Sequence, residues 1–289
     1  MKFQQTLAVV ASFLTASVYG ADNSSAHSPV DSIRHQYNAG RNLTIGWIVF
    51  NGYAPLDIWG PLSIVSALSS RYNMTLVAIH KEKGALVNNI NPYTRPGGSV
   101  ENYPYMLRTP SILATHTPED APPLDLLMVP GGSNYLTPSS DNEWIEAFVR
   151  SRYASTDYVA SVCSGAVSLA RAGIMDGKRA TTNKWAWADL VKLGPKVEWV
   201  PNARWVADDG GKLWTSSGVA AGMDMMYALM SYLYGAEKVD LTMNAIELSP
   251  HTDSAWDPYA VVHKVPGANV SRSLFDLVGP AGYAPPTAA

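Results

Sequence analysis

Cysteine is almost absent from this chain, which has one in 289 residues, Cys163. A single cysteine excludes an internal disulfide, so a hydrophobic core must stabilise the fold. Charged residues are also few, at 16%, and lysine and arginine form no cluster interleaved with aromatic residues. With a formal net charge of −3, nothing in the composition favours a nucleic acid or a membrane as partner. The 47% hydrophobic content is that of a globular protein.

Long apolar runs are missing as well, since the best candidate, 219–235, is interrupted by Asp224. The short apolar run Leu7–Val18 lies between a positive start and small residues around Gly20, which predicts a signal peptide over residues 1–20 and a secreted protein. Four Asn-x-Ser/Thr sequons fit this route and are candidate glycosylation sites: Asn23, Asn42, Asn73 and Asn269.

Three parts are expected after the signal peptide. Residues 21–42 are a polar leader without periodicity, expected to pack loosely if at all. Residues 43–250 alternate apolar runs with amphipathic stretches, which predicts one α/β domain with a mainly parallel sheet covered on both faces. Residues 251–289 form a tail with many Pro and Gly and no clear element.

Local patterns predict the individual elements. The expected strands are 43–50, 74–79, 124–129, 158–162 and 179–182, with a hairpin of 197–205 and 212–216 around Asp208-Asp209-Gly210-Gly211. The expected helices are 61–69, 143–153, 166–172, 185–193, 221–234 and 237–247. The Pro-, Gly- and Asn-rich segment 84–123 is expected to hold a short hairpin or an irregular insertion.

The one cysteine follows an apolar strand and precedes a helix of small residues, in Ser161-Val162-Cys163-Ser164-Gly165. Small residues two positions to either side permit a tight, strained turn that exposes the side chain at the carboxyl end of the sheet. The helix N-terminus behind it is expected to lower the pKa of the thiol. The alternative is a structural cysteine at the end of a buried strand.

Pro130-Gly131-Gly132 ends the preceding predicted strand. Because the carboxyl ends of adjacent parallel strands meet at one crevice, the amides of Gly131, Gly132 and Ser164 are candidates for an oxyanion hole. An ordinary turn is the alternative reading of these glycines.

The turn at Cys163 and the Pro130-Gly131-Gly132 motif are followed along the chain by the segments Arg179–Thr182 and Thr215–Asp224. Together and in this order, these motifs resemble the ThiJ/PfpI superfamily of class I glutamine amidotransferase-like proteins. They are most similar to its isonitrile hydratase branch, and the resemblance runs from Leu43 to Leu248. It implies a flavodoxin-like three-layer sandwich with a nucleophile elbow, usually a homodimer.

The resemblance also implies an acidic residue that approaches the cysteine from the loop after the first strand, and Asp57 holds that place. A partly desolvated Asp57 would have a raised pKa and could exchange a proton with Cys163 or with a substrate. A helix cap is the alternative role. The expected catalytic residues are therefore Cys163, Asp57 and, through its hydroxyl, Ser164.

The chain departs from related sequences where they often carry histidine, at Ser164 and Asn183. A Cys-His-acid triad is therefore not expected. Neither a metal nor another cofactor is expected, because no two of these histidines have metal-ligand spacing: His80, His116, His251 and His263. Trp59 and Trp185 lie in segments near the predicted crevice and suggest an apolar substrate pocket.

The sequence thus predicts a cofactor-independent, cysteine-dependent hydratase or lyase, isonitrile hydratase-like, whose partner is a small organic molecule. Two alternatives stay open: a cyclase or other secondary-metabolite enzyme on the same site, and a non-enzymatic redox-sensing or ligand-binding protein. Peptidase and glyoxalase activities are disfavoured by Ser164.

Overall fold

A six-stranded sheet forms the centre of the computed structural model, which describes residues 29–91, 107–133, 135, 139–271 and 274. The strand order is β2-β1-β5-β6-β10-β9, and every neighbouring pair is parallel except β10 with β9. The strands are β1 (Leu43–Ile48), β2 (Met74–Ile79), β5 (Leu126–Val129), β6 (Tyr158–Val162), β9 (Trp205–Asp208) and β10 (Leu213–Ser216). The predicted α/β fold with a mainly parallel sheet is confirmed.

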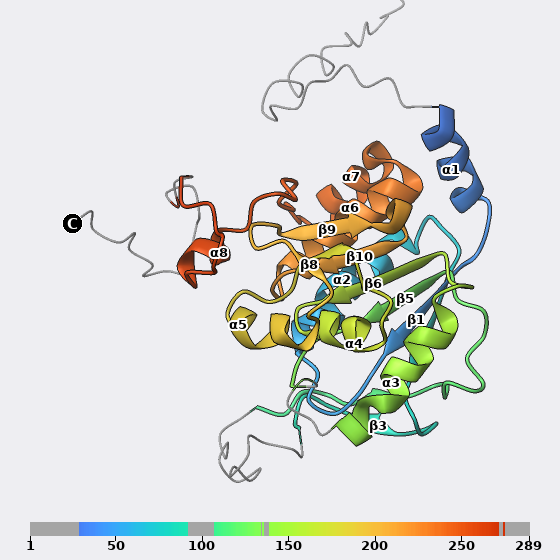
Figure 1. Cartoon of the computed structure of the whole chain (residues 1–289). Coiled ribbons are helices and arrows are strands. Elements are labelled where there is room, and N and C mark those ends of the chain that lie inside the picture. Colours follow the sequence, from blue (N-terminus) through green and yellow to red (C-terminus); the bar gives the residue numbers. More distant parts are fainter. Residues whose placement is uncertain (1–28, 92–106, 134, 136–138, 272–273, 275–289) are drawn as a thin grey trace, which may run out of the picture.

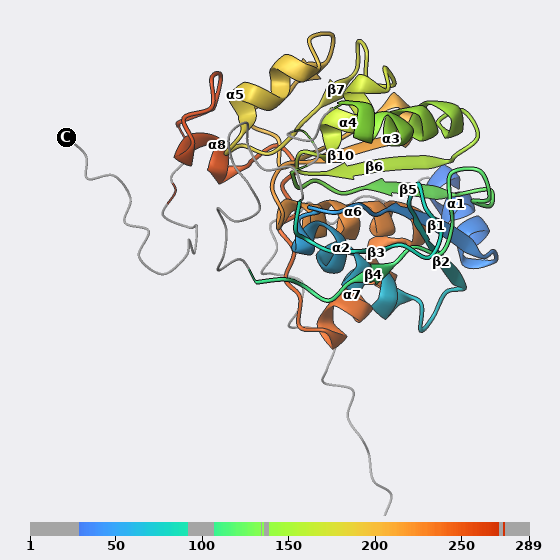
Figure 2. The same cartoon turned by 90° about the horizontal axis from the view of Figure 1, so that it is seen from below.

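Helices cover both faces of this sheet, so the molecule has three layers (Figures 1 and 2). One face carries α3 (Ser139–Arg152), α4 (Gly165–Arg171) and α5 (Trp187–Leu190), and the other carries α2 (Pro55–Leu68), α6 (Ala221–Tyr234) and α7 (Ala236–Ala245). All four residues of β5 are buried, because a central strand between two helical layers has no solvent-facing side.

The helix predicted from Pro61 begins six residues earlier, at Pro55, and continues through Pro61. Pro55 suits the first helical turn because its missing N–H would have no partner there. Asp57 therefore lies in the first turn of α2 and not in the loop before it.

The segment 197–205 was predicted to form a single strand, but it does not. Its start forms β8 (Glu198–Trp199), which pairs in parallel with β7 (Arg179–Ala180), and the edge strand β9 begins only at Trp205. The turn between β9 and β10 is a short 3₁₀ helix, Asp209–Gly211, and another, Val191–Leu193, follows α5. In the described part of 84–123, β3 (Leu86–Val87) pairs antiparallel with β4 (Ile112–Leu113).

The leader does not pack loosely where the structure describes it, because residues Pro29–Ala39 form a helix, α1. Asn38 donates its amide hydrogen to the Leu233 carbonyl at 3.3 Å, and the Arg34 guanidinium lies 3.5 Å from the centre of the Tyr232 ring. Both partners belong to α6, so α1 is part of the packed domain.

The tail also holds an element that was not predicted, α8 (Pro258–Val262). The Asp257 side chain caps it by accepting from the Tyr259 amide, and Ala260 packs in a small apolar cluster with Trp187 of α5. Figures 1 and 2 both show α8 beside α5, at the end of the sheet away from α1. A chain cut at residue 250 would lack α8 and its contacts with α5.

The signal peptide and Asn23 lie outside the described residues, so export stays a prediction. Asn42, Asn73 and Asn269 all lie outside helices and strands, and their glycosylation is likewise untested. No helix in the described ranges is long and apolar enough to cross a membrane.

The close approach of α6 to β6 makes a stability test possible at Gly222. A Cβ atom there would lie 2.6 Å from the Val162 side chain, one residue before Cys163. We expect Gly222→Ala to lower the free energy of unfolding by about 1–3 kcal/mol, the usual cost of overpacking a core. Gly40→Ala, whose Cβ would have nothing closer than 3.5 Å, is the control. Equal stabilities of the two variants in urea denaturation would contradict this packing.

Candidate active site

Cys163 occupies a strained turn between β6 and α4, with a φ of 58° that non-glycine residues rarely adopt. Two hydrogen bonds hold this backbone: the Cys163 amide donates to the Ser216 carbonyl at 3.2 Å, and the Thr182 hydroxyl donates to the Cys163 carbonyl at 2.9 Å. A Cβ at Gly165 would lie 2.2 Å from the Val129 carbonyl oxygen, so this position requires glycine. The predicted elbow is present.

Asp57 reaches the elbow from the first turn of α2 and is completely buried. Its Oδ2 accepts the Gly131 amide at 2.9 Å, and its carboxylate is in side-chain hydrogen-bonding contact with the Cys163 thiol. Oδ1 accepts no other hydrogen bond from the described residues. The side chain does not cap its own helix. The structure therefore brings Asp57 and Cys163 together.

Burial sets the protonation of this pair. It raises the pKa of Asp57 to about 7, although the hydrogen bonds from Gly131 and Cys163 favour the charged form. Burial, and next the negative charge of Asp57, also raises the pKa of the Cys163 thiol. This is opposite to the predicted lowering, because donors from Ser164 and Asn183 offset only part of the desolvation. Near neutral pH the site holds a neutral thiol beside a carboxyl group that is about half protonated.

The amides proposed as an oxyanion hole already have acceptors within the protein. Gly131 donates to Asp57, and Gly132 donates to the Ser164 hydroxyl oxygen at 2.9 Å. That hydroxyl in turn donates to the Gly132 carbonyl at 2.9 Å, and the Ser164 amide hydrogen-bonds the cysteine sulfur. In this arrangement Gly131 ties the loop after β5 to α2, Gly132 ties it to the elbow, and the Ser164 amide is directed at the sulfur, so none of the three amides is free for a substrate oxygen.

Asn183 is a site residue that the sequence analysis did not select. Its side chain hydrogen-bonds the cysteine sulfur and favours the thiolate, while its Oδ1 accepts the Ala186 amide at 3.0 Å. In the sequence this position stands out only because related sequences often carry histidine there. An amide can donate to sulfur, but it cannot carry a proton between groups as imidazole does.

Comparison with known proteins supports this geometry. A model described as the DJ-1/PfpI family matches residues 99–232. An isonitrile hydratase from Pseudomonas putida is 33% identical over 208 residues, which are 72% of this chain and 79% of that protein. The chain belongs to the DJ-1/PfpI family. The resemblance inferred from the elbow motifs is confirmed.

Several solved structures share the fold. A ThiJ/PfpI family protein from Pseudomonas syringae is 25% identical, with a TM-score of 0.57 over 73% of this chain and 77% of that one. Drosophila melanogaster DJ-1beta, at 18% identity, has a TM-score of 0.54 over 72% of this chain and 100% of that one. An AraC family transcriptional regulator from Pseudomonas putida is 17% identical, with a TM-score of 0.56 over 71% of this chain and 99% of that one. The last two likenesses show the fold alone.

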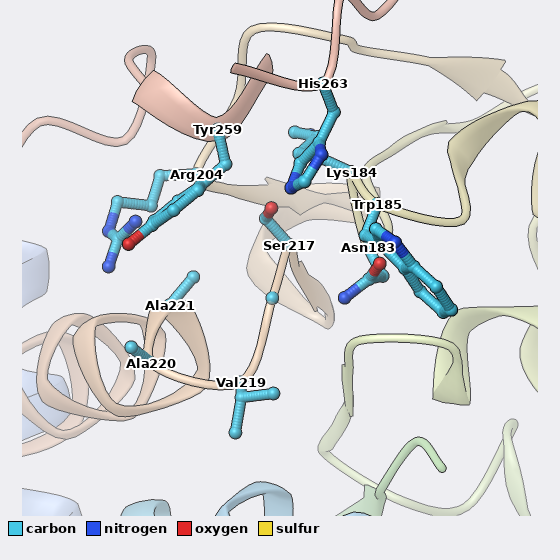
Figure 3. Close-up of a pocket in the computed structure, with 11 residues that line it drawn as sticks. Asn183, Lys184, Trp185, Arg204, Ser217, Val219, Ala220, Ala221, Tyr259 and His263 are labelled. Carbon is cyan, nitrogen blue, oxygen red and sulfur yellow. The ribbon is translucent and has the colours of Figure 1, made fainter. Parts of the chain in front are cut away.

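A pocket lies next to the elbow of this DJ-1/PfpI protein and encloses about 590 Å³, counting the part open to solvent (Figure 3). Asn183 joins the two, because it lines the pocket and contacts the sulfur. Of the two predicted pocket tryptophans, Trp185 lines the cavity and Trp59 does not. Tyr259 and His263 of the C-terminal segment line it too, and no periodic pattern in the sequence indicates α8 or their place in a pocket.

The described residues contain no group of three or more His, Cys, Asp or Glu side chains that could hold a metal ion.

The raised pKa of Asp57 predicts a stability cost that grows with pH. A folded-state pKa near 7, above the ordinary 3.8, means that the folded protein loses stability as the pH rises from about 4 through about 7. Asp57→Asn keeps an acceptor for Gly131 and removes the charge. We expect it to raise the free energy of unfolding by a few kcal/mol at pH 8, since one pKa unit corresponds to about 1.4 kcal/mol. At pH 4 the gain should nearly vanish. A gain independent of pH in urea denaturation would contradict a titrating Asp57.

The raised thiol pKa predicts slow alkylation of Cys163. We expect the iodoacetamide rate of the native protein to be below that of a free thiol at pH 7 and to keep rising above pH about 8.5, the ordinary thiol value. The urea-unfolded protein, with the same single cysteine, is the matched control. A plateau of the native rate below pH 8 would mean a thiolate at neutral pH and would refute this assignment.

Proposed function

We propose that this DJ-1/PfpI protein is a cysteine-dependent hydratase that adds water to an isonitrile and releases an N-substituted formamide. The observation that carries the proposal is the buried pair of Cys163 and Asp57, in which the carboxyl pKa is raised to about 7. The isonitrile hydratase from Pseudomonas putida, at 33% identity, supports the choice of reaction.

The pair suits an electrophile that must receive a proton as it is attacked. The Cys163 sulfur forms a bond to the terminal isonitrile carbon, and Asp57 delivers a proton to that same carbon while it takes up the thiol proton. The product of this step is a thioimidate, in which the former isonitrile carbon carries one hydrogen, the sulfur and a double bond to nitrogen. No charged intermediate remains in the buried site.

Water completes the reaction. Asp57, still protonated after the first step, gives its proton to the thioimidate nitrogen while it accepts a proton from the water that adds to the thioimidate carbon. The carbon–sulfur bond then breaks as the proton of the new hydroxyl group passes to the sulfur, and the formamide leaves. Overall, one isonitrile and one water give one formamide, and Cys163 and Asp57 return to their starting protonation states. A carboxyl group with a pKa near 7 can both give and accept a proton at neutral pH.

The same geometry disfavours two of the other functions. A peptidase must protonate an amine leaving group, a task usually given to histidine, yet the side chain next to the sulfur is Asn183. A redox-sensing cysteine is normally exposed and ionised, whereas Cys163 is 7% exposed and its pKa is raised. A lyase or cyclase reaction uses the same pair, and substrate trials separate it from hydration.

Activity measurements test the proposal. With an aromatic isonitrile, the wild-type protein should form the formamide, detected by NMR together with loss of the isonitrile infrared band. Cys163→Ala should abolish turnover, and Asp57→Asn should reduce it on the order of 10²-fold, the usual loss for a general acid–base group. His251→Ala is the control, because only the His251 backbone contacts the buried Asp224. Formamide production that survives in Cys163→Ala would refute the mechanism.

A further inference from the structure

The pocket beside the elbow combines apolar walls with a buried lysine. Figure 3 shows Tyr259 and His263 on one side, the start of α6 on the opposite side, and Asn183 with Trp185 between them. Lys184 also lines the cavity although its side chain is only 2% exposed. Because burying a lysine is costly, its presence in the wall indicates a ligand with a polar or charged group.

Lys184 has no carboxylate partner among the described residues. Its ammonium donates to the Thr181 hydroxyl at 2.5 Å and lies 4.6 Å from the centre of the Trp187 ring. An ammonium has three N–H donors, and a buried charge is costly unless an opposite charge accompanies it. Burial lowers the pKa of Lys184 to about 7, so near neutral pH the amine is protonated only in part, and an anion beside it would favour the charged form. The arrangement thus leaves N–H donors at the pocket wall without a carboxylate to receive them.

The neighbouring Arg204 is different, because its charge is already compensated. It donates to Asp224 at 2.6 Å and to Asp257 at 3.4 Å. Asp257 also accepts from the Ser217 hydroxyl and the Tyr259 amide, so its oxygens are committed. Asp257 acts on Lys184 only at longer range, where it opposes the lowering of the lysine pKa by burial and by Arg204.

The start of α6 adds a second feature favourable to an anion. Residues 218–221 line the pocket, and the 14-residue helix begins at Ala221 with no side-chain cap on Ala220. The Gly222 and Met223 amides already donate to the carbonyls of Val219 and Ala220, at 3.2 and 3.0 Å, so the amides that remain for a ligand are those of residues 219–221. The helix dipole places partial positive charge there. Two independent elements, a buried lysine and an uncapped helix start, therefore line one cavity.

We propose that this pocket binds a carboxylate carried by the substrate, with Lys184 and the amides of residues 219–221 as its donors. The inference rests on the proposed function for the reacting group, which Cys163 attacks at the Asn183 end of the pocket. The substrate is then an isonitrile that bears a carboxylic acid and an apolar side chain. If both groups are on one carbon, hydration yields an N-formyl amino acid.

Binding of a product of this class tests the inference without any turnover. Calorimetry compares N-formylphenylalanine with its uncharged amide, N-formylphenylalaninamide, on the wild-type protein at pH 7. We expect the acid to bind roughly tenfold more tightly or better, as charge-assisted hydrogen bonds are stronger than neutral ones. The preference should be lost in Lys184→Met and in Lys184→Gln, the second of which can still hydrogen-bond Thr181. Lys192→Met removes an exposed lysine in the same segment and should keep the preference.

Three outcomes overturn the inference: equal binding of acid and amide, no binding of the acid, or a preference for the acid that survives both Lys184 substitutions with the fold intact by circular dichroism. The outcome is separate from that of the proposed reaction. Tight, Lys184-dependent binding of the acid supports the carboxylate site even if no isonitrile is hydrated, and turnover of uncharged isonitriles leaves the binding result unchanged.

Discussion

The hydrogen bond from the Gly131 amide to Asp57 is the constraint on which the site depends. It joins α2 to the loop after β5, two segments that are 74 residues apart in the chain. Because it holds a carboxyl group in a space without solvent, Asp57 keeps a proton at a pH where an exposed aspartate would have lost it. The loop is held on its other side by Ser164, whose hydroxyl both accepts from and donates to Gly132. The elbow, the loop and the acid are thus one hydrogen-bonded unit.

A buried thiol beside a buried acid differs from the usual picture of an activated cysteine. In cysteine proteases and redox enzymes the environment stabilises the thiolate before the substrate arrives. Here desolvation keeps the sulfur protonated, and the backbone at Cys163 is strained. In the proposed reaction, reactivity comes from a concerted movement of protons when a substrate is bound. This arrangement favours addition reactions to uncharged, linear groups over displacement of poor leaving groups.

The sequence predicted those parts of the structure that depend on local pattern. The limits of β6 and α6 are those predicted, because both are uninterrupted apolar or amphipathic runs next to clear turns. Asp57 could be paired with Cys163 only through the family resemblance, since the contact joins distant segments. The pKa of Cys163 was predicted in the wrong direction, because burial depends on the helices packed around the elbow and no local motif reports it. The burial of Lys184 was missed for the same reason. The pocket roles of Tyr259 and His263 were missed because the tail that carries them has no periodic pattern.

The position of α8 has a consequence for how such a protein can change. The reacting pair belongs to the body of the sheet, whereas one wall of the pocket comes from a short segment after the last large helix, attached mainly through Asp257 and the Trp187 cluster. Substitutions, insertions or replacement of that segment alter which molecules fit without disturbing the strained elbow. The strained elbow and this one wall of the pocket are thereby encoded in separate stretches of the gene, and they can diverge at different rates.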